Sequence, residues 1–264
     1  MSHSNHLSQS LTQMAMDGKH LTDDSCLSEK ILSEAINEII VYAAERFKPL
    51  GFNIVHEKTI SLFECQTFFQ KVGGPAPNPD FTKVCMKPDG GVLYAVCSKD
   101  SSIKTPILIV EDKIQGTNDS RFLEGKDKQA TGNAIERGAK NIRGAEMIFA
   151  GLDVFPYVLF ASGCDFHHTE TISQRLVMMN MGVPNHYIDI TPTTTPLDIQ
   201  STMNVLLSSI NIKKLAGKSI ASIFVKAHKW DAMKHGASCW KKEERVLILK
   251  KVIDKVIEST TFAN

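Results

Sequence analysis

The feature that most constrains the fold of this chain is a run of four apolar residues, 107–110, followed directly by Glu111, Asp112 and Lys113. Successive side chains of a strand point to opposite faces of a sheet, so an entirely apolar strand must be covered on both faces. Sheets covered on both faces are typical of α/β proteins. We therefore expect an α/β fold in which helices flank a central sheet and this strand lies in its interior.

Hydrophobic periodicity along the rest of the chain agrees with this fold class. Helices are expected at 28–47, 59–71, 129–149, 169–181, 197–210 and 241–258. Strands are expected at 52–55, 81–86, 92–97, 107–113, 155–161, 187–190 and 220–227. Turn-forming residues separate 81–86, 92–97 and 107–113, which predicts an antiparallel meander; helices alternate with the later strands, which predicts parallel pairing. The expected architecture is a mixed central β-sheet, antiparallel first and parallel later.

Composition divides the chain into two parts. Residues 1–27 are rich in polar side chains and contain only isolated apolar residues, so we expect them to form a flexible N-terminal arm. Residues 28–264 are expected to form a single domain that begins with a helix capped by Ser28.

Charge and cysteine usage limit the classes of function. Thirty Lys and Arg against 29 Asp and Glu give a formal net charge of +1, so any nucleic-acid partner must be argued from local residues. The six cysteines show no C-x-x-C spacing, and no apolar run approaches the roughly 20 residues of a membrane span. We expect a cytoplasmic protein with free thiols and no membrane association.

The charged end of the strand 107–113 indicates a metal site. Glu111 and Lys113 are two residues apart and share one face, while Asp112 points away from them. Asp89 lies in a Pro-Asp-Gly-Gly turn before the neighbouring strand and can approach the same end. Two carboxylates beside one lysine suit Mg²⁺ and phosphodiester hydrolysis. Taken separately, each feature is better explained by an ordinary turn or a surface ion pair.

A second group of residues, 129–137, has the chemistry needed to contact DNA bases. Asn133 and Arg137 are four residues apart on one helical face, and both side chains can bond purines in the major groove. Glycine and small residues before them permit close backbone approach to a ligand. Four basic residues around this group could bind phosphates: Lys126, Lys128, Lys140 and Arg143. Without further context, an ordinary surface helix would explain the same pattern.

Four sequence runs occur together and in a specific order. They are KPDGG at 87–91, VEDK at 110–113, GNAIER at 132–137 and FPYVLF at 155–160. In this order and spacing, they resemble the EcoRI-like type II restriction endonucleases of the PD-(D/E)xK superfamily. The resemblance covers about residues 85–166. It implies a restriction-endonuclease-like fold and a Mg²⁺-dependent enzyme that cuts double-stranded DNA at a palindrome with an AATT core, leaving 5′-phosphate ends.

The resemblance also implies roles for particular residues. Asp89, Glu111 and Lys113 match the family's catalytic residues, with Asp89 and Glu111 as metal ligands. The DNA-binding residues implied are Gln129, Ala130, Thr131, Gly132, Asn133, Ala134, Glu136 and Arg137. Among these, Asn133, Ala134 and Arg137 match residues that read the AATT core, and Glu136 matches one that orients them. The expected partners are double-stranded DNA, a second copy of the chain in a homodimer, and a cognate DNA methyltransferase acting on the same site.

The chain departs from the family pattern at two places. Asp112 stands where the family pattern has a small apolar residue, so this chain carries an additional negative charge beside the proposed site. Gln129 and Thr131 differ at positions that read the outer base pair, so GAATTC, a degenerate flank and bare AATT all remain open. A repair or structure-specific nuclease, or a catalytically inactive DNA-binding protein, would also fit parts of the pattern. Glu57 matches another acidic position of the family only loosely.

A basic run near the end of the chain, 241–251, has two interpretations. Its charged members are Lys241, Lys242, Arg245, Lys250 and Lys251. They could contact the DNA backbone, but helical spacing favours the solvated face of an amphipathic helix.

Overall fold

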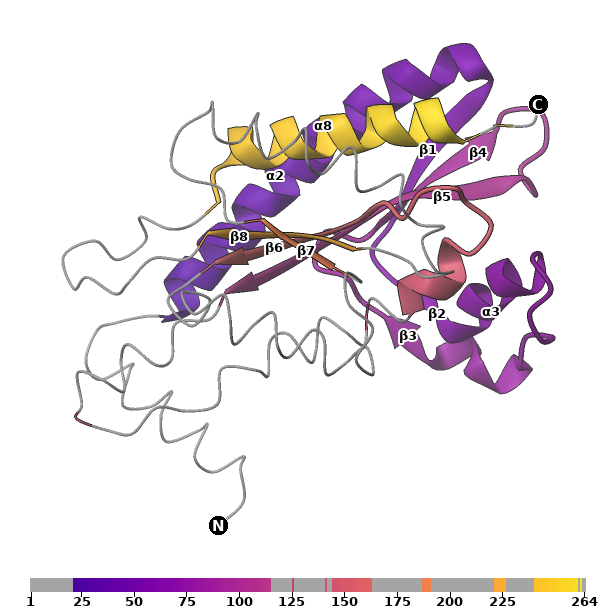
Figure 1. Cartoon of the computed structure of the whole chain (residues 1–264), viewed down its shortest axis with the longest axis horizontal. Helices are drawn as coiled ribbons and strands as arrows, with labels where there is room; N and C mark the ends of the chain where they lie inside the picture. Colours follow the sequence, from indigo (N-terminus) through magenta and orange to yellow (C-terminus); the bar gives the residue numbers. More distant parts are fainter. Residues whose placement is uncertain are drawn as a thin grey trace.

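A six-stranded mixed sheet forms the centre of the molecule (Figure 1). The computed structural model of the chain describes residues 21–114, 125, 141, 144–162, 187–190, 221–226, 240–260 and 262. The strand order is β1-β4-β5-β6-β8-β7. The strands are β1 (Phe52–Glu57), β4 (Val92–Cys97), β5 (Lys104–Ile114), β6 (Tyr157–Ser162), β7 (Tyr187–Ile190) and β8 (Ala221–Lys226).

The pairing changes direction at β5, as predicted from the sequence. β1, β4 and β5 pair antiparallel, and β5, β6, β8 and β7 pair parallel. A register shift places Ile107 as an extra residue between the pairs Leu93–Leu108 and Tyr94–Pro106. Such a bulge lets Ile107 and Leu108 face the same side, where both join one core cluster. β5 is an interior strand, and Ile107–Val110 are fully buried, as the apolar run required.

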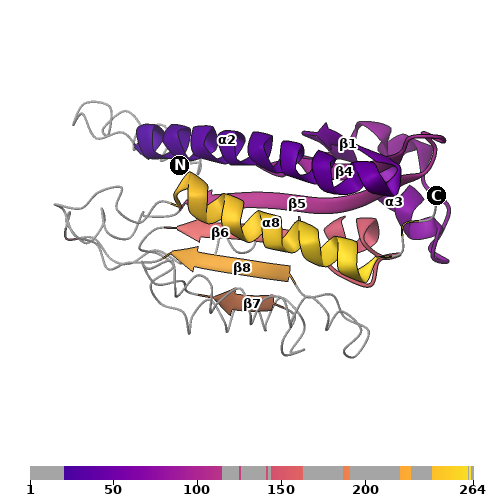
Figure 2. The same cartoon turned by 90° about the horizontal axis from the view of Figure 1, so that it is seen from above.

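Two long helices cover one face of the sheet and lie side by side (Figure 2). They are α2 (Leu21–Phe47) and α8 (Lys242–Ser259), and the short 3-10 helix η1 (Lys48–Leu50) follows α2. Their apolar faces meet Leu93, Leu108 and Val110 of the sheet in the larger core cluster. Burial of this shared surface is the main force that holds the helices on the sheet.

Smaller elements cover the opposite face. They are β2 (Ile60–Ser61), α3 (Leu62–Gln70), the 3-10 helix η2 (Pro79–Lys83), β3 (Cys85–Met86) and a helical turn at 144–148. Ser61 caps α3, because its side chain accepts a hydrogen bond from the Glu64 amide at 3.1 Å. Ile109 lies in this second cluster, whereas Leu108 and Val110 lie in the first. The sheet is therefore covered on both faces.

Two expectations about local structure were wrong. Residues 81–86 were expected to be the first strand of the meander, but Pro79 starts η2, and Cys85–Met86 pairs with β2 in a separate two-stranded sheet. β1 takes the place beside β4 instead. The first helix begins at Leu21, within the segment expected to be an arm, so Ser28 does not cap it. Ser28 lies within the helix, and its buried hydroxyl donates to Asp112 of β5.

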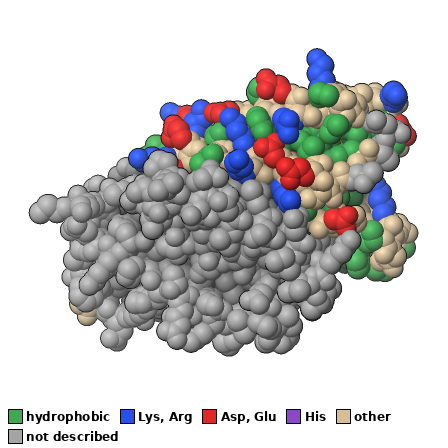
Figure 3. Space-filling view, turned by 45° about the horizontal axis from the view of Figure 1, so that its top comes forward, with side chains coloured by type: hydrophobic (Ala, Val, Ile, Leu, Met, Phe, Trp, Pro, Cys, Tyr) green, Lys and Arg blue, Asp and Glu red, His purple; other side chains and the backbone are tan. Residues whose placement is uncertain are grey.

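Other expectations lie outside the described residues. These are the order or disorder of residues 1–20, the helices at 169–181 and 197–210, and most of the helix at 129–149. None of the helices in the described part combines the length and apolar character needed to cross a membrane. On the described part of the face shown in Figure 3, Lys and Arg are interspersed with Asp and Glu, in keeping with the balanced charge.

Candidate active site

The site begins at the charged end of β5. Alternation along the strand places Asp112 on the side of Leu108 and Val110, beneath α2 and α8, and Glu111 on the side of Ile109. Lys113 shares the face of Glu111, and its Nζ lies 2.5 Å from Glu111 Oε1. The predicted division of the three charges between two faces is confirmed.

The turn at 88–91 brings Asp89 to the same place. The turn is closed by a hydrogen bond from the Gly91 amide to the Pro88 carbonyl at 2.9 Å. The Gly90 amide donates to the Val110 carbonyl of β5, also at 2.9 Å. A Cβ on Gly90 would lie 2.7 Å from Val110 Cβ, so this close approach to β5 requires glycine. The Asp89 amide donates to Glu111 Oε2 at 3.2 Å.

Lys113 joins the two carboxylates. Its Nζ lies 2.6 Å from Asp89 Oδ2 and 2.5 Å from Glu111 Oε1. Exposure increases across the group, from 2% for the Glu111 side chain to 20% for Lys113 and 36% for Asp89. Glu111 is therefore the buried member of the group, whereas Lys113 and Asp89 are partly exposed and can be reached by a ligand from solvent.

Burial and the neighbouring charges shift the pKa values of Glu111 and Lys113. Burial raises the pKa of Glu111, and Asp89 adds to this effect, while Lys113 opposes it. Burial alone would lower the pKa of Lys113, but Glu111 and Asp89 more than compensate and raise it above its usual value. Lys113 is therefore an ammonium at neutral pH, held between two acids.

The donor set fits one divalent cation of the oxygen-preferring kind. Asp89 Oδ2 and Glu111 Oε1 contact the same nitrogen, so a single ion can reach both carboxylates. Mg²⁺ takes one or two protein carboxylates and fills its other positions with water and phosphate oxygens. Within the described part of the chain, no group of three or more His, Cys, Asp or Glu side chains could hold a metal. Two carboxylates at a partly exposed position suit an oxygen-preferring divalent cation that keeps water among its ligands.

One contact in the site was not predicted. Asn141 Nδ2 donates to Glu111 Oε1 at 2.8 Å, so it orients the carboxylate that Lys113 also contacts. Asn141 lies thirty positions from Glu111. It belongs to a segment that the sequence predicted only as helix, and no spacing rule links the two residues.

The structure keeps Glu57 out of this group. Its carboxylate accepts from Lys104 Nζ at 2.8 Å, and Glu64 accepts from the same nitrogen at 2.7 Å. The eight DNA-binding candidates at 129–134, 136 and 137 lie outside the described residues.

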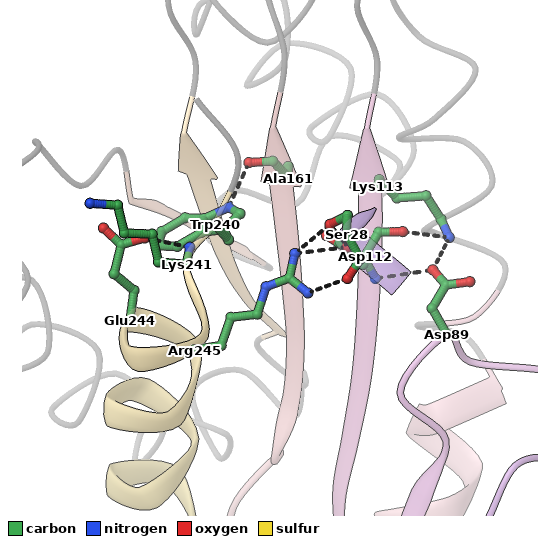
Figure 4. Close-up of polar contacts among 9 residues, drawn as sticks. All are labelled: Ser28, Asp89, Asp112, Lys113, Ala161, Trp240, Lys241, Glu244 and Arg245. Atoms are coloured by element: carbon green, nitrogen blue, oxygen red, sulfur yellow. Dashed lines mark hydrogen bonds and ion pairs between the residues drawn. The ribbon is translucent and has the colours of Figure 1, made fainter. Parts of the chain in front are cut away.

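The expectation for the basic run at 241–251 was wrong for Arg245. Its side chain is fully buried, and Nη2 lies 2.9 Å from Asp112 Oδ2 (Figure 4). The extra negative charge of Asp112 is thus balanced from the face opposite Lys113. Lys242 and Lys250 do lie at the surface, where both pair with Glu38.

Two comparisons with known proteins include this region. The family model described as restriction endonuclease EcoRI matches residues 17–256, a range that contains Asp89, Glu111 and Lys113. The type II restriction enzyme EcoRI of Escherichia coli is 30% identical over 164 residues, covering 56% of this chain. The match spans 58% of that relative's own length.

Proposed function

The chain belongs to the restriction endonuclease EcoRI family, and we propose that it is a Mg²⁺-dependent type II deoxyribonuclease that cuts both strands of duplex DNA. The observation that carries this proposal is the Lys113 ammonium held between Asp89 and Glu111 at the end of an interior strand. The two carboxylates offer a place for a cation, and the Lys113 ammonium offers a positive charge for a phosphate.

Hydrolysis forms a bond from a water oxygen to phosphorus and breaks the bond from phosphorus to the 3′ oxygen. The products are a 5′-phosphate and a 3′-hydroxyl. A bound Mg²⁺ would supply positive charge against the phosphate and would lower the pKa of the attacking water. Asp89 and Glu111 would hold the ion, and Asn141 orients Glu111 through its hydrogen bond.

Lys113 stabilises negative charge on the reacting phosphate. Its raised pKa keeps it protonated in the free protein, which suits electrostatic stabilisation. At 20% exposure, its ammonium is close enough to solvent to meet a phosphate oxygen. Its contacts with Asp89 and Glu111 fix its position before DNA binds, so little reorganisation is needed during the reaction.

Sequence recognition is assigned to the segment after β5. By the family resemblance, Asn133, Ala134 and Arg137 read an AATT core, and Glu136 orients them. Gln129, Ala130, Thr131 and Gly132 are assigned to DNA binding as well, with Gln129 and Thr131 at positions that read the outer base pair. A palindrome is read by a two-fold dimer, so the proposed active form is a homodimer. A cytoplasmic enzyme of this kind needs a cognate methyltransferase that protects the host's own sites.

Replacing Lys113 tests the catalytic assignment. We expect Lys113→Ala to abolish Mg²⁺-dependent cleavage of duplex DNA while leaving specific binding, measured without Mg²⁺, within a few-fold of the parent. Lys99→Ala is the matched control, because Lys99 is exposed in the hairpin at the other end of β5. Chelation with EDTA should stop the parent and the control alike. Undiminished cleavage by Lys113→Ala would refute the role.

Digestion of a phage genome of known sequence tests the specificity. Sequencing the product ends should show one palindromic site containing AATT, with a phosphate on each 5′ end. Uniform digestion of unrelated duplexes would instead favour a structure-specific nuclease. Specific binding without Mg²⁺-dependent cutting would favour an inactive DNA-binding protein.

A further inference from the structure

A buried ion pair lies behind the catalytic end of β5. Arg245 and Asp112 have side-chain exposures of 0% and 7%, and their closest atoms are 2.9 Å apart. Ser28 Oγ donates to Asp112 Oδ2 at 2.6 Å, and Arg245 Nη2 donates to Ser28 Oγ at 2.7 Å. Arg245 Nη1 also donates to the Ser28 carbonyl at 3.1 Å. These three side chains, which we term the rear triad, join α2, β5 and α8 (Figure 4).

Stability alone is a weak explanation for the rear triad. Removing two charges from water is costly, and apolar residues of similar volume often give equal or greater stability than a buried ion pair. The surrounding face is apolar: Arg245 lies over the Phe160 ring at 5.6 Å, and Val110 is in the same core. What the charged pair adds is a fixed orientation, because the hydrogen bonds are directional and the hydrophobic contacts are not.

The main chain of Asp112 is itself part of the site. Its amide donates to Asp89 Oδ2 at 3.0 Å, and its carbonyl accepts from Lys113 Nζ at 3.1 Å. The residue therefore contacts two catalytic side chains through its backbone on one face of the sheet. On the other face, its carboxylate is held by Ser28 and Arg245.

We propose that the rear triad is a positioning unit for the nuclease site: it fixes the backbone of Asp112, and this backbone holds Asp89 and Lys113 in their catalytic arrangement. The inference rests on the proposed nuclease function. Asp112 and Arg245 do not touch the reacting groups with their side chains, so they are positioning residues. Asp112 is then a working part of this chain's site, with Arg245 as its required partner.

A double variant separates positioning from stability. Asp112→Ala combined with Arg245→Met removes both charges and leaves apolar side chains in their place, so no buried charge stays unpaired. We expect its unfolding midpoint to stay close to the parent's. Single-turnover cleavage at saturating DNA and Mg²⁺ should fall on the order of tenfold to a hundredfold, because small displacements of reacting groups are costly. Affinity for the specific duplex, measured without Mg²⁺, should change little.

Two further measurements make the test specific. Amide hydrogen exchange of the peptide spanning residues 110–114 should become faster in the double variant, because the backbone at residue 112 is no longer held by its side chain and its hydrogen bond to Asp89 opens more often. Asp112→Asn should keep more of the cleavage rate than Asp112→Ala, because its amide oxygen can still accept from Ser28 and Arg245. Lys99→Ala again serves as the control and should match the parent in every measurement.

The outcomes distinguish the two proposals. A double variant that cleaves at the parent's rate, or whose exchange at 110–114 is unchanged, would overturn the positioning role and leave the nuclease function intact. A parent protein that cuts no duplex with Mg²⁺ would refute the nuclease function, and the positioning role with it. Slower cleavage together with faster local exchange, in a variant that remains folded, is the result that supports the inference.

Discussion

The position of the Asp89 carboxylate depends on a residue with no side chain. Gly91 has φ 74°, in the left-handed region that favours glycine. A Cβ there would lie 2.5 Å from His56 Nε2 and 2.6 Å from the Glu57 carbonyl oxygen. His56 Nε2 also lies 3.0 Å from the Gly90 carbonyl oxygen, so β1 supports the turn from its outer side. The glycines of the Pro-Asp-Gly-Gly motif are thus required by the backbone of the turn that places the proposed catalytic carboxylate of Asp89.

Gly91→Ala should therefore impair both folding and cleavage. The left-handed backbone alone costs a non-glycine residue about 1–3 kcal/mol, and the clash with β1 must also push the turn and Asp89 away from β5. Gly73→Ala is the control, since Gly73 has φ 95° but no neighbouring atom within 4 Å of the added Cβ. Denaturant unfolding should show a loss for both variants, and cleavage should fall only for Gly91→Ala. Equal cleavage by the two would show that the turn tolerates displacement.

Two cysteines offer a test of burial near the small sheet. Burial raises the pKa of the Cys65 thiol to about 12, whereas Cys85 is exposed. The thiolate is the reactive form, so a raised pKa keeps Cys65 protonated and inert at neutral to mildly alkaline pH. We expect iodoacetamide at pH 8 to modify Cys85 in the native protein and spare Cys65, as read by peptide mass spectrometry. Denatured protein should be modified at both, and native modification of Cys65 would contradict the burial.

Some residues of the site could be predicted from the sequence because their geometry is local. The spacing of Glu111 and Lys113 follows from the period of a strand, and the turn motif placed Asp89 near them. Asn141 and Arg245 could not be found this way. Each contacts β5 only after distant parts of the chain have packed, and Arg245 stands in a basic run that is otherwise at the surface.

At the scale of elements, the two long helices determine how β5 is held. α2 and α8 pack on each other and on the same face of the sheet, so the rear triad lies where all three elements meet. α8 begins beside this point, where the Lys241 amide donates to Glu244 Oε2 at 2.9 Å and Trp240 Nε1 donates to the Ala161 carbonyl at 3.0 Å. The start of α8 is thereby fixed to β6, which limits movement of Arg245.

Loosening α8 should weaken the whole fold. Leu249 is fully buried in the larger core cluster, so Leu249→Ala should lower the free energy of unfolding by roughly 2–5 kcal/mol through lost burial and a cavity. Val41→Ala on α2 is the control, because that side chain is 59% exposed and its loss should change stability by less than about 0.5 kcal/mol. Urea denaturation followed by circular dichroism would measure both. A small effect at Leu249 would mean that α8 is not part of the cooperative unit.

The fold class and most elements followed from periodicity, and the failures have a physical cause. The strands β4, β5, β6, β7 and β8 and the helices α3 and α8 lie close to their expected positions. The prediction for segment 81–86 failed because its apolar residues suit a strand locally, whereas strand pairing depends on tertiary packing, and in the fold β1 pairs with β4. The sequence gives no long-range signal that β1, rather than its own neighbour in the chain, takes that place.

At the scale of the whole molecule, the topology places the site at the carboxyl ends of the parallel strands. β5, β6, β8 and β7 run parallel, so their carboxyl ends point the same way, and Glu111 and Lys113 lie at that end of β5. Ligands of open α/β sheets bind beyond these carboxyl ends. In the proposed nuclease, each chain has one such site and acts on one phosphodiester. Cutting both strands of a palindrome would then require two copies of the chain related by a two-fold axis.

A mixed dimer tests whether each subunit cuts one DNA strand. If each subunit cuts one strand, a dimer of one parent subunit and one Lys113→Ala subunit should nick supercoiled plasmid to the open circle and produce little linear DNA. Differently tagged subunits, co-expressed and purified through both tags, would supply the mixed dimer for a single-turnover assay. A dimer that pairs the parent with Lys99→Ala should linearise the plasmid at the parent's rate. Rapid linear product from the Lys113→Ala mixed dimer would mean that one active site serves both strands, and the two-fold arrangement would then be unnecessary for double-strand cleavage.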